Sequence, residues 1–427
     1  MDGPPTVEDM KTADKTPAPG RTVRKPAIWL ASALLAGGLT LAGCATTAES
    51  ASDSGSSSAS TRSAAIDTSA TGAADATTTQ ETIQDTTDAV EAFLATLSDE
   101  QVDAVTYDYD DETKTTSWSN FPVTFVERAG LNLADLTQEQ QQAAMAVLEA
   151  LLSDEAYETV TSIMGGDQYL LENSDSTETS LGQYYIAFFG EASDSTAYSV
   201  QFGGHHLGIN ADLNGAEDTI TFAPTHLGVQ PAVYTDEDGE EVQPFDGIYT
   251  DAFAFFDSLT EEQQATLTSG DVTFCAPGDT CDFSSGSGLT GADLTDEQKQ
   301  LLLELIANWA GMADQETTDA QLAAIEATLD DTVIAWSGET TYDMSTGDGI
   351  DFSISGPNVY VAFQAQQGSA GADVEGVSTS GWGHVHTIYR DPTNDYAGSV
   401  EQQAASGMGG GAPGDGAAPG GDGAPDQ

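Results

Sequence analysis

The sequence has very few basic residues. Lys and Arg together number 10 against 70 Asp and Glu, which gives a formal net charge of -60. Beyond the first 43 residues the basic side chains are those of Arg62, Lys114, Arg128, Lys299 and Arg390. Such a chain repels phosphate groups, which excludes nucleic-acid binding and the binding of an anionic membrane through a basic patch. The acidity predicts a strongly hydrated surface.

Long apolar runs and the common catalytic motifs are also missing. The apolar stretch from Ala27 to Leu41 is too short and too rich in Ala and Gly for a transmembrane helix. The sequence contains no Gly-x-Ser-x-Gly, no His-Glu-x-x-His and no Gly-rich phosphate loop. The sequence therefore assigns the protein to no class of reaction, and whether it is an enzyme stays open.

The first of the three cysteines predicts where the protein is located. Residues 1–43 have the basic start and apolar centre of a signal peptide. They end in "LAGC", which resembles the bacterial lipobox and predicts a lipid on Cys44. Two acyl chains anchor a protein stably, so we expect a lipoprotein on the extracytoplasmic face of the cell membrane. An ordinary signal peptide with a chance cysteine is the alternative.

The other two cysteines, Cys275 and Cys281, lie in "CAPGDTC". Outside the cytoplasm, such a closely spaced pair predicts a disulfide around a tight turn. The alternative is a redox or metal site, but no basic residue nearby would lower a thiol pKa.

Composition divides the rest of the chain. Residues 44–83 are mostly Ser, Thr, Ala and Asp and predict a disordered tether, and the Gly/Ala/Pro-rich residues 398–427 predict a disordered tail. We expect one folded region over 84–397. Four pairs of similar segments recur in the same order within it, among them "AFLATLSDEQ" and "AFFDSLTEEQ". They predict an internal repeat with halves of about 84–235 and 250–397, related by a pseudo-twofold axis.

The local patterns predict an α+β fold with a mostly antiparallel sheet. Four "L-[ST]-x-E-Q" segments predict helix starts with reciprocal caps at Ser98, Thr137, Thr260 and Thr295. Another helix is expected over 319–329. Alternating and β-branched segments joined by short turns predict antiparallel strands. They are 104–118, 184–190, 197–203, 205–211, 218–223, 226–234, 331–337, 350–355, 358–365 and 382–389.

The five histidines are the candidate site. In an extended strand His384 and His386 share one face about 7 Å apart, close enough to bind one metal ion. His205 and His206 would point to opposite faces, so only one of them joins, and His226 is a fourth ligand or a supporting residue. Three imidazoles with an open position suit Zn, Cu or Ni. The alternative is that the histidines only pin strands together through hydrogen bonds.

The segment "YRDPTNDY" continues from the second histidine pair. Asp391 with Pro392 and Asn394 with Asp395 are typical of turns. Arg390 either pairs with a nearby carboxylate and fixes the turn, or binds an anion together with its neighbours. Arg128 has the same two interpretations. The segment "DMSTGDGIDFS" (343–353) lacks the regular acidic spacing of a calcium loop and predicts a hairpin.

The segments "YYIAFFG", "FGGHHLGIN", "HLGVQPA" and "GHVHTIYRDPTNDY" together resemble the exported bacterial proteins known as domain of unknown function 3500. The resemblance covers most of residues 90–397 and implies a shared fold and a shared use of the histidine segments. It implies no activity. The chain departs from the family pattern at Tyr198, where the family has Trp, and at Ala397, where it has Gly.

The expectation with most support is a membrane-tethered extracytoplasmic protein that binds a transition-metal ion. A surface hydrolase with a histidine base and Arg390 as anion binder is the first alternative. A non-catalytic interaction module of the cell envelope is the second. The sequence names no protein partner, no oligomeric state and no single metal.

Overall fold

The computed structural model of the chain describes residues 65–71, 76–268, 272–279, 281, 283 and 288–400. The expected signal peptide, the lipidation site Cys44, most of the tether and the end of the tail lie outside these residues. Within them, no helix is both long enough and apolar enough to cross a membrane.

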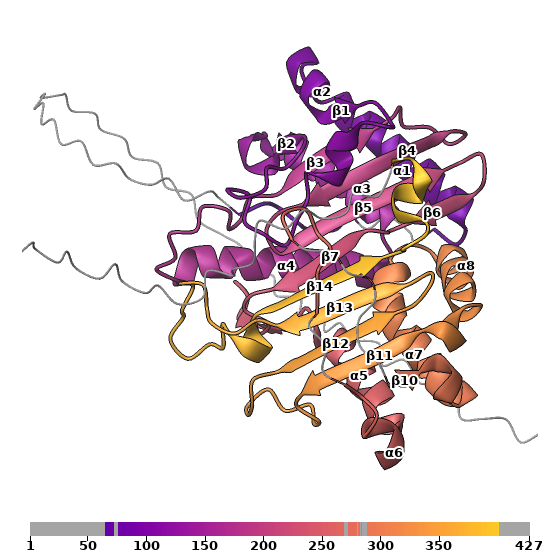
Figure 1. Ribbon diagram of the computed structural model, residues 1–427. Coiled ribbons are helices and arrows are strands. Elements are labelled where there is room, and N and C mark those ends of the chain that lie inside the picture. Colours follow the sequence, from indigo (N-terminus) through magenta and orange to yellow (C-terminus); the bar gives the residue numbers. More distant parts are fainter. Residues whose placement is uncertain are drawn as a thin grey trace, which may run out of the picture. The chain divides into compact units, whose positions relative to one another are not determined.

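One large sheet organises the described residues, as Figure 1 shows. It has 12 strands in the order β1-β3-β4-β5-β7-β14-β13-β12-β11-β10, with β2 beside β3 and β6 beside β5. All pairs are antiparallel except β1 with β3. The strands are β1 (Thr106–Tyr107), β2 (Leu131–Asn132), β3 (Tyr185–Phe189), β4 (Ala197–Gly203), β5 (Leu207–Asn214), β6 (Thr219–Thr221), β7 (Thr225–Val229), β10 (Leu289–Thr290), β11 (Val333–Gly338), β12 (Ile350–Ser355), β13 (Tyr360–Ala365) and β14 (Val385–Arg390). A separate hairpin pairs β8 (Tyr234–Thr235) with β9 (Glu241–Val242).

The middle of this sheet joins segments that are distant along the chain. Strand β7 pairs with β14 in antiparallel register, with Val229 opposite Val385 and Thr225 opposite Tyr389. Strands β1 to β7 therefore lie on one side of this seam, and β10 to β14 on the other. The expected halves contribute to one sheet and not to two.

Four of the described helices begin where the capping pattern predicts. At all four predicted caps, the Ser or Thr side chain accepts from the backbone amide of the Gln three residues on, and that Gln side chain returns to the cap's own amide. The described helices are α1 (Thr79–Leu94), α2 (Asp99–Val105), α3 (Gln138–Leu151), α4 (Asp154–Asn173), α5 (Asp246–Ser258), α6 (Glu261–Gln264), α7 (Asp296–Ala310) and α8 (Gln315–Glu326). Helix α1 starts five residues before the expected boundary at 84, because Thr78 caps it.

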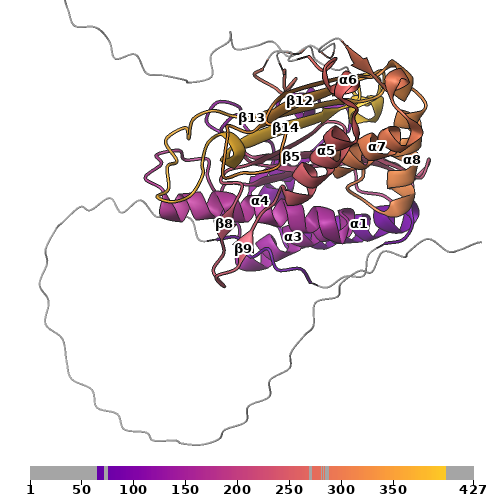
Figure 2. The same ribbon diagram turned by 90° about the horizontal axis from the view of Figure 1, so that it is seen from below.

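Helices cover one face of the sheet (Figure 2), and loops pack on the other. On the helix-covered face, the indole N–H of Trp309 in α7 donates to Thr387 in β14. Since side chains alternate along a strand, His384, His386, Ile388 and Arg390 face the other way. There Ile388 packs in a small apolar cluster with Trp118 and Phe274, which come from loops. The α+β, mostly antiparallel fold expected from the sequence is confirmed.

One expected strand is mostly absent, and one helix was not expected. Residues 104–118 form no long strand; only Thr106–Tyr107 are extended, and a short 3-10 helix at Glu112–Thr115 follows. The aromatic and Thr-rich pattern here serves a loop that carries Trp118 onto the sheet. The 20-residue helix α4, capped by Ser153, was not expected from the sequence.

Candidate metal centre

The five histidines lie together, although they come from three separate segments. Ring centroids are 5.0 Å apart between His384 and His386, 5.3 Å between His206 and His386, and 5.4 Å between His226 and His386. The group includes His205, whose ring stacks on that of His206 at 4.2 Å. All five side chains are buried. The pairing of β7 with β14 creates this cluster, because it places His226 beside the strand that carries His386.

The expectation that His205 and His206 point to opposite faces is wrong. The two residues form the turn between β4 and β5, and strand β5 begins only at Leu207. In a turn, neighbouring side chains can lie on the same side, and here both rings enter the cluster. The turn needs the glycines before it, since a Cβ on Gly204 would lie 2.5 Å from the carbonyl oxygen of Gln183.

Helix α4 supplies a carboxylate that orients His206. Nδ1 of His206 lies 2.5 Å from Oδ1 of Asp167, and the hydroxyl of Tyr184 donates to Oδ2 at 2.7 Å. A carboxylate can only accept, so the proton of the neutral ring sits on Nδ1. In that neutral form Nε2 of His206 carries a lone pair, and this atom is buried without a hydrogen-bond partner among the described residues.

A second hydrogen-bonded chain fixes the proton of His386. Nδ1 of His384 faces the carbonyl oxygen of Gly368 at 3.2 Å, so it holds the proton and Nε2 of His384 accepts. Nε2 of His386 lies 3.0 Å from that atom and is the donor. This leaves the lone pair of His386 on Nδ1, which is also buried and unpaired within the described part of the chain.

The third unpaired nitrogen is Nδ1 of His205. His205, His206 and His386 each offer one ring nitrogen within 4.8 Å of the others, the spacing at which one metal ion can be shared. A buried polar atom without a partner costs roughly 1–3 kcal/mol, so three in one place are typical of a site that accepts a ligand. Imidazole nitrogens are ligands for Zn, Cu and Ni, and they suit Mg²⁺ and Ca²⁺ poorly.

His226 and His384 have supporting roles in this arrangement. Both ring nitrogens of His226 face backbone carbonyls, Nδ1 that of Thr387 at 2.7 Å and Nε2 that of His205 at 3.2 Å. Its ring lies nearly parallel to that of His386, at 6°. The neutral ring of His226 has one N–H, so it donates either to β14 or to the histidine turn. His384 sets the proton on His386.

Burial favours the neutral form of His205, His226, His384 and His386. It lowers the pKa of His205 and His386 well below the ordinary value, and the neighbouring imidazoles add to the effect. The same cause lowers the pKa of His226 to about 4 and that of His384 to about 3. Neutral imidazole is the form that binds metals.

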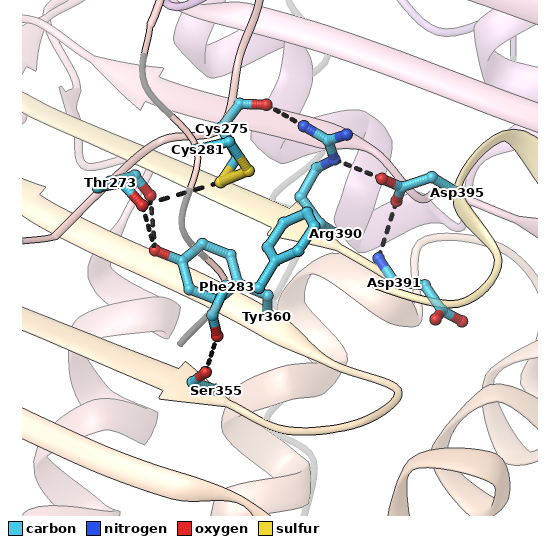
Figure 3. Close-up of a disulfide and its surroundings, with 9 residues drawn as sticks. All are labelled: Thr273, Cys275, Cys281, Phe283, Ser355, Tyr360, Arg390, Asp391 and Asp395. Atoms are coloured by element: carbon cyan, nitrogen blue, oxygen red, sulfur yellow. Dashed lines mark hydrogen bonds and ion pairs between the residues drawn. A yellow bond between two sulfur atoms is a disulfide. The ribbon is translucent and has the colours of Figure 1, made fainter. Parts of the chain in front are cut away.

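The predicted turn after β14 is present, and Arg390, the last residue of β14, binds to it. Nε of Arg390 donates to Oδ2 of Asp395 at 2.6 Å, and Nη1 donates to the carbonyl oxygen of Cys275 (Figure 3). Asp391 accepts from backbone amides within the turn, including that of Asn394. Arg390 follows His386 by four residues on the same face, roughly 13 Å along the strand. The structural ion pair is therefore confirmed, and Arg390 does not lie beside the histidines.

Arg128 and the cysteine pair also have structural roles. Arg128 donates to four backbone carbonyls, and two of these bonds hold Gly204, just before the histidine turn. The predicted disulfide between Cys275 and Cys281 is formed (Figure 3). The bridge begins directly after Phe274, which packs edge-on against His386 at 6.1 Å.

Asp167 and Tyr184 are the site residues that sequence reasoning missed. The apolar positions of α4 include Tyr157, Val160, Ile163 and Leu170, and Asp167 occupies one place in that buried stripe. A carboxylate in an apolar stripe is rare unless it is paired. That signal could have identified it.

Comparison with known proteins agrees with the resemblance noted in the histidine segments. The comparison with curated proteins finds no match, and neither does the comparison with solved structures. The family described as "Protein of unknown function (DUF3500)" matches residues 79–398, which include every histidine of the cluster and the turn after β14. The chain belongs to the DUF3500 family.

Proposed function

We propose that this protein binds one transition-metal ion through His205, His206 and His386, and that it does so tethered to the outer face of the cell membrane. The observation that carries the metal proposal is that His205, His206 and His386 each offer a ring nitrogen within 4.8 Å of the others. Each of the three also has a buried ring nitrogen without a hydrogen-bond partner among the described residues. In His206 and His386, a hydrogen bond at the other ring nitrogen fixes the tautomer of the neutral ring. The unpaired nitrogen is then the one that carries the lone pair.

The supporting shell around the site strengthens the metal proposal. Histidine ligands of metals usually donate their second ring N–H to a carboxylate or a carbonyl, which fixes the ring and raises its basicity. The contact from His206 to Asp167 is of this kind. By contrast, both ring nitrogens of His226 face backbone carbonyls, and in the neutral ring one of the two donates.

Zinc, copper and nickel all fit three neutral nitrogen ligands. A bound ion in this site would polarise whatever ligand completed its coordination. Because the cluster is buried, the chemistry favours storage or transfer of the ion over rapid turnover of a large substrate. The acidic surface would raise the local concentration of cations around the protein.

Metal analysis tests the proposal. The protein is stripped with a chelator, mixed with Zn²⁺, Cu²⁺, Ni²⁺ or Mg²⁺, separated from free metal, and analysed for bound metal per chain. We expect one tightly held transition-metal ion and no tightly held Mg²⁺. Surface carboxylates bind cations weakly, so the variants His206→Gln and His386→Gln supply the baseline, and both should lose the tight ion.

His226→Gln is the matched control, because it changes a histidine of the same cluster that offers no free nitrogen. It should keep the ion. Equal metal content in the wild type, His386→Gln and His226→Gln would overturn the proposal. Thermal melting of each variant separates loss of the site from loss of the fold.

The tether is proposed on sequence grounds, from "LAGC" and the segment before it. Cell fractionation tests it. The natural protein should sediment with membranes, and Cys44→Ser should shift it to the soluble fraction.

A further inference from the structure

A cavity of about 560 Å³ lies on the loop-covered face of the sheet, apart from the histidine nitrogens. Its walls come from the loop after α2, the disulfide loop and the end of β14. Two of the four basic residues in the described part of the chain, Arg128 and Arg390, line it together. Two arginines at one cavity are unusual in a chain that has 70 acidic residues and only 10 basic ones.

Among the described residues, no acid lies close enough to Arg128 to pair with its charge. Its hydrogen bonds all go to backbone carbonyls, and no carboxylate of the described residues lies within 4 Å of its nitrogens. The side chain is only 7 % exposed. A buried charge without a counter-charge is unfavourable, and an anion in the adjoining cavity would relieve it.

Arg390 has an unused hydrogen-bonding edge. Nε binds Asp395 and Nη1 binds the carbonyl oxygen of Cys275, while Nη2 donates to no described residue (Figure 3). A guanidinium offers five N–H donors in one plane, which match the two oxygens of a carboxylate. Among the described residues, the one acid that lines the cavity is Glu127, which is exposed at its rim.

The remaining walls are partly aromatic. Trp118 and Tyr396 line the cavity, joined by a hydrogen bond of 2.8 Å from the indole N–H to the phenol oxygen. Phe125 lies on the rim and is 60 % exposed, and it is the large apolar side chain most open to water in the described chain. Exposed aromatic residues beside a cavity are typical of ligand contacts.

We propose that this cavity binds a small organic carboxylate, with the acid group at Arg128 and Arg390 and the apolar part against Trp118, Tyr396 and Phe125. The volume is within the range of small-molecule sites. Planar guanidinium groups favour a carboxylate, and the aromatic walls favour an organic anion over inorganic phosphate. This proposal is independent of metal binding at the histidines.

Calorimetric titration of metal-free protein with benzoate, acetate and inorganic phosphate tests the proposal. Benzoate should bind saturably at one site, with a dissociation constant in the millimolar range or below. It should bind more tightly than acetate, which lacks the apolar part, and more tightly than phosphate.

Two surface variants probe the site without touching the buried arginines. Phe125→Ser removes an aromatic contact and should weaken benzoate binding roughly 2- to 10-fold. Glu127→Gln removes a repelling charge and should tighten it roughly 2- to 5-fold. The matched controls are the neighbouring Thr124→Ala and the distant, exposed Glu139→Gln, which should leave binding unchanged.

Three results would overturn the proposal. They are no saturation by benzoate in the millimolar range, binding that neither Phe125→Ser nor Glu127→Gln alters, and tighter binding of phosphate than of benzoate.

Discussion

Asp167 and His206 are joined by a contact of 2.5 Å between Oδ1 and Nδ1, from a helix to a turn, with both side chains buried. Tyr184 holds the other oxygen of Asp167. Tyr184 therefore holds the carboxylate in place independently of the imidazole. Because Asp167 in turn orients the ring of His206, the position of α4 sets the direction in which Nε2 points.

This relationship predicts that Asp167→Asn weakens metal binding without abolishing it. Loss of a supporting carboxylate typically lowers metal affinity 10- to 100-fold, and we expect a loss of about that size. Competition with a coloured chelator at neutral pH measures it. Tyr184→Phe, which keeps the carboxylate and removes only its hydrogen-bond donor, should have a smaller effect. Unchanged affinity in Asp167→Asn would show that His206 is not a ligand.

Addition of the bound metal should stabilise the folded protein. A ligand that binds only the native state adds RT ln(1 + [L]/Kd), about 2.7 kcal/mol at 100 times Kd. Calorimetric melting of stripped protein with and without Zn²⁺ measures the gain, with Mg²⁺ as the control for general screening of the acidic surface. The gain should disappear in His386→Gln. A gain of equal size with Mg²⁺ would contradict a specific site.

A second buried carboxylate predicts a dependence of stability on pH. Burial raises the pKa of Asp212 from 3.8 to about 6, although Nζ of Lys114 lies 3.8 Å away. Between these values the unfolded chain releases this proton while the folded protein keeps it. The contribution of Asp212 to stability is therefore complete below about pH 4 and is lost as the pH rises through about 6.

Asp212→Asn removes that loss, because the amide does not titrate. Its unfolding free energy relative to the wild type should rise between pH 4 and pH 6, by roughly 2–3 kcal/mol. Urea denaturation across this range measures the difference. The exposed Asp103→Asn is the control and should show no such trend. A flat difference for Asp212→Asn would mean that Lys114 keeps Asp212 ionised throughout.

Removal of the disulfide should destabilise the protein modestly. Cys275 and Cys281 are separated by 6 positions, and closure of so short a loop contributes roughly 2 kcal/mol in the chain-entropy model. The double variant Cys275→Ser/Cys281→Ser should lose about this much in urea denaturation. Addition of a reductant to the wild type should reproduce the loss and leave the double variant unchanged. Equal stability of the two proteins would show that the bridge only positions the loop.

Local signals predicted much of this fold. Strands β4 and β12 have the bounds that alternation predicts, 197–203 and 350–355. The four capping boxes formed because a Ser or Thr and a Gln three residues later satisfy each other within one turn of helix. Such interactions need no information from the rest of the chain.

The parts that were missed depend on tertiary packing. Alternation puts His205 and His206 on opposite faces because it assumes a continuous strand. The strand in fact ends at Gly203, and alternation alone does not reveal that end. Asp167 was missed because its partner is 39 residues away. The internal repeat stays a prediction. In its favour, Gln140 donates to the carbonyl oxygen of Thr96 and Gln298 to that of Ser258. In both cases the acceptor lies two positions before the residue that caps the preceding helix.

The pairing of β7 with β14 has a consequence for how the protein matures. His226 and its carbonyl partner Thr387 are 161 positions apart, so the imidazoles meet only after both β7 and β14 have been made and have paired. Contacts of such long range form late in folding. A half-built chain would lack the assembled ligand set, and binding of an ion would then mark the molecules in which β7 and β14 have paired correctly.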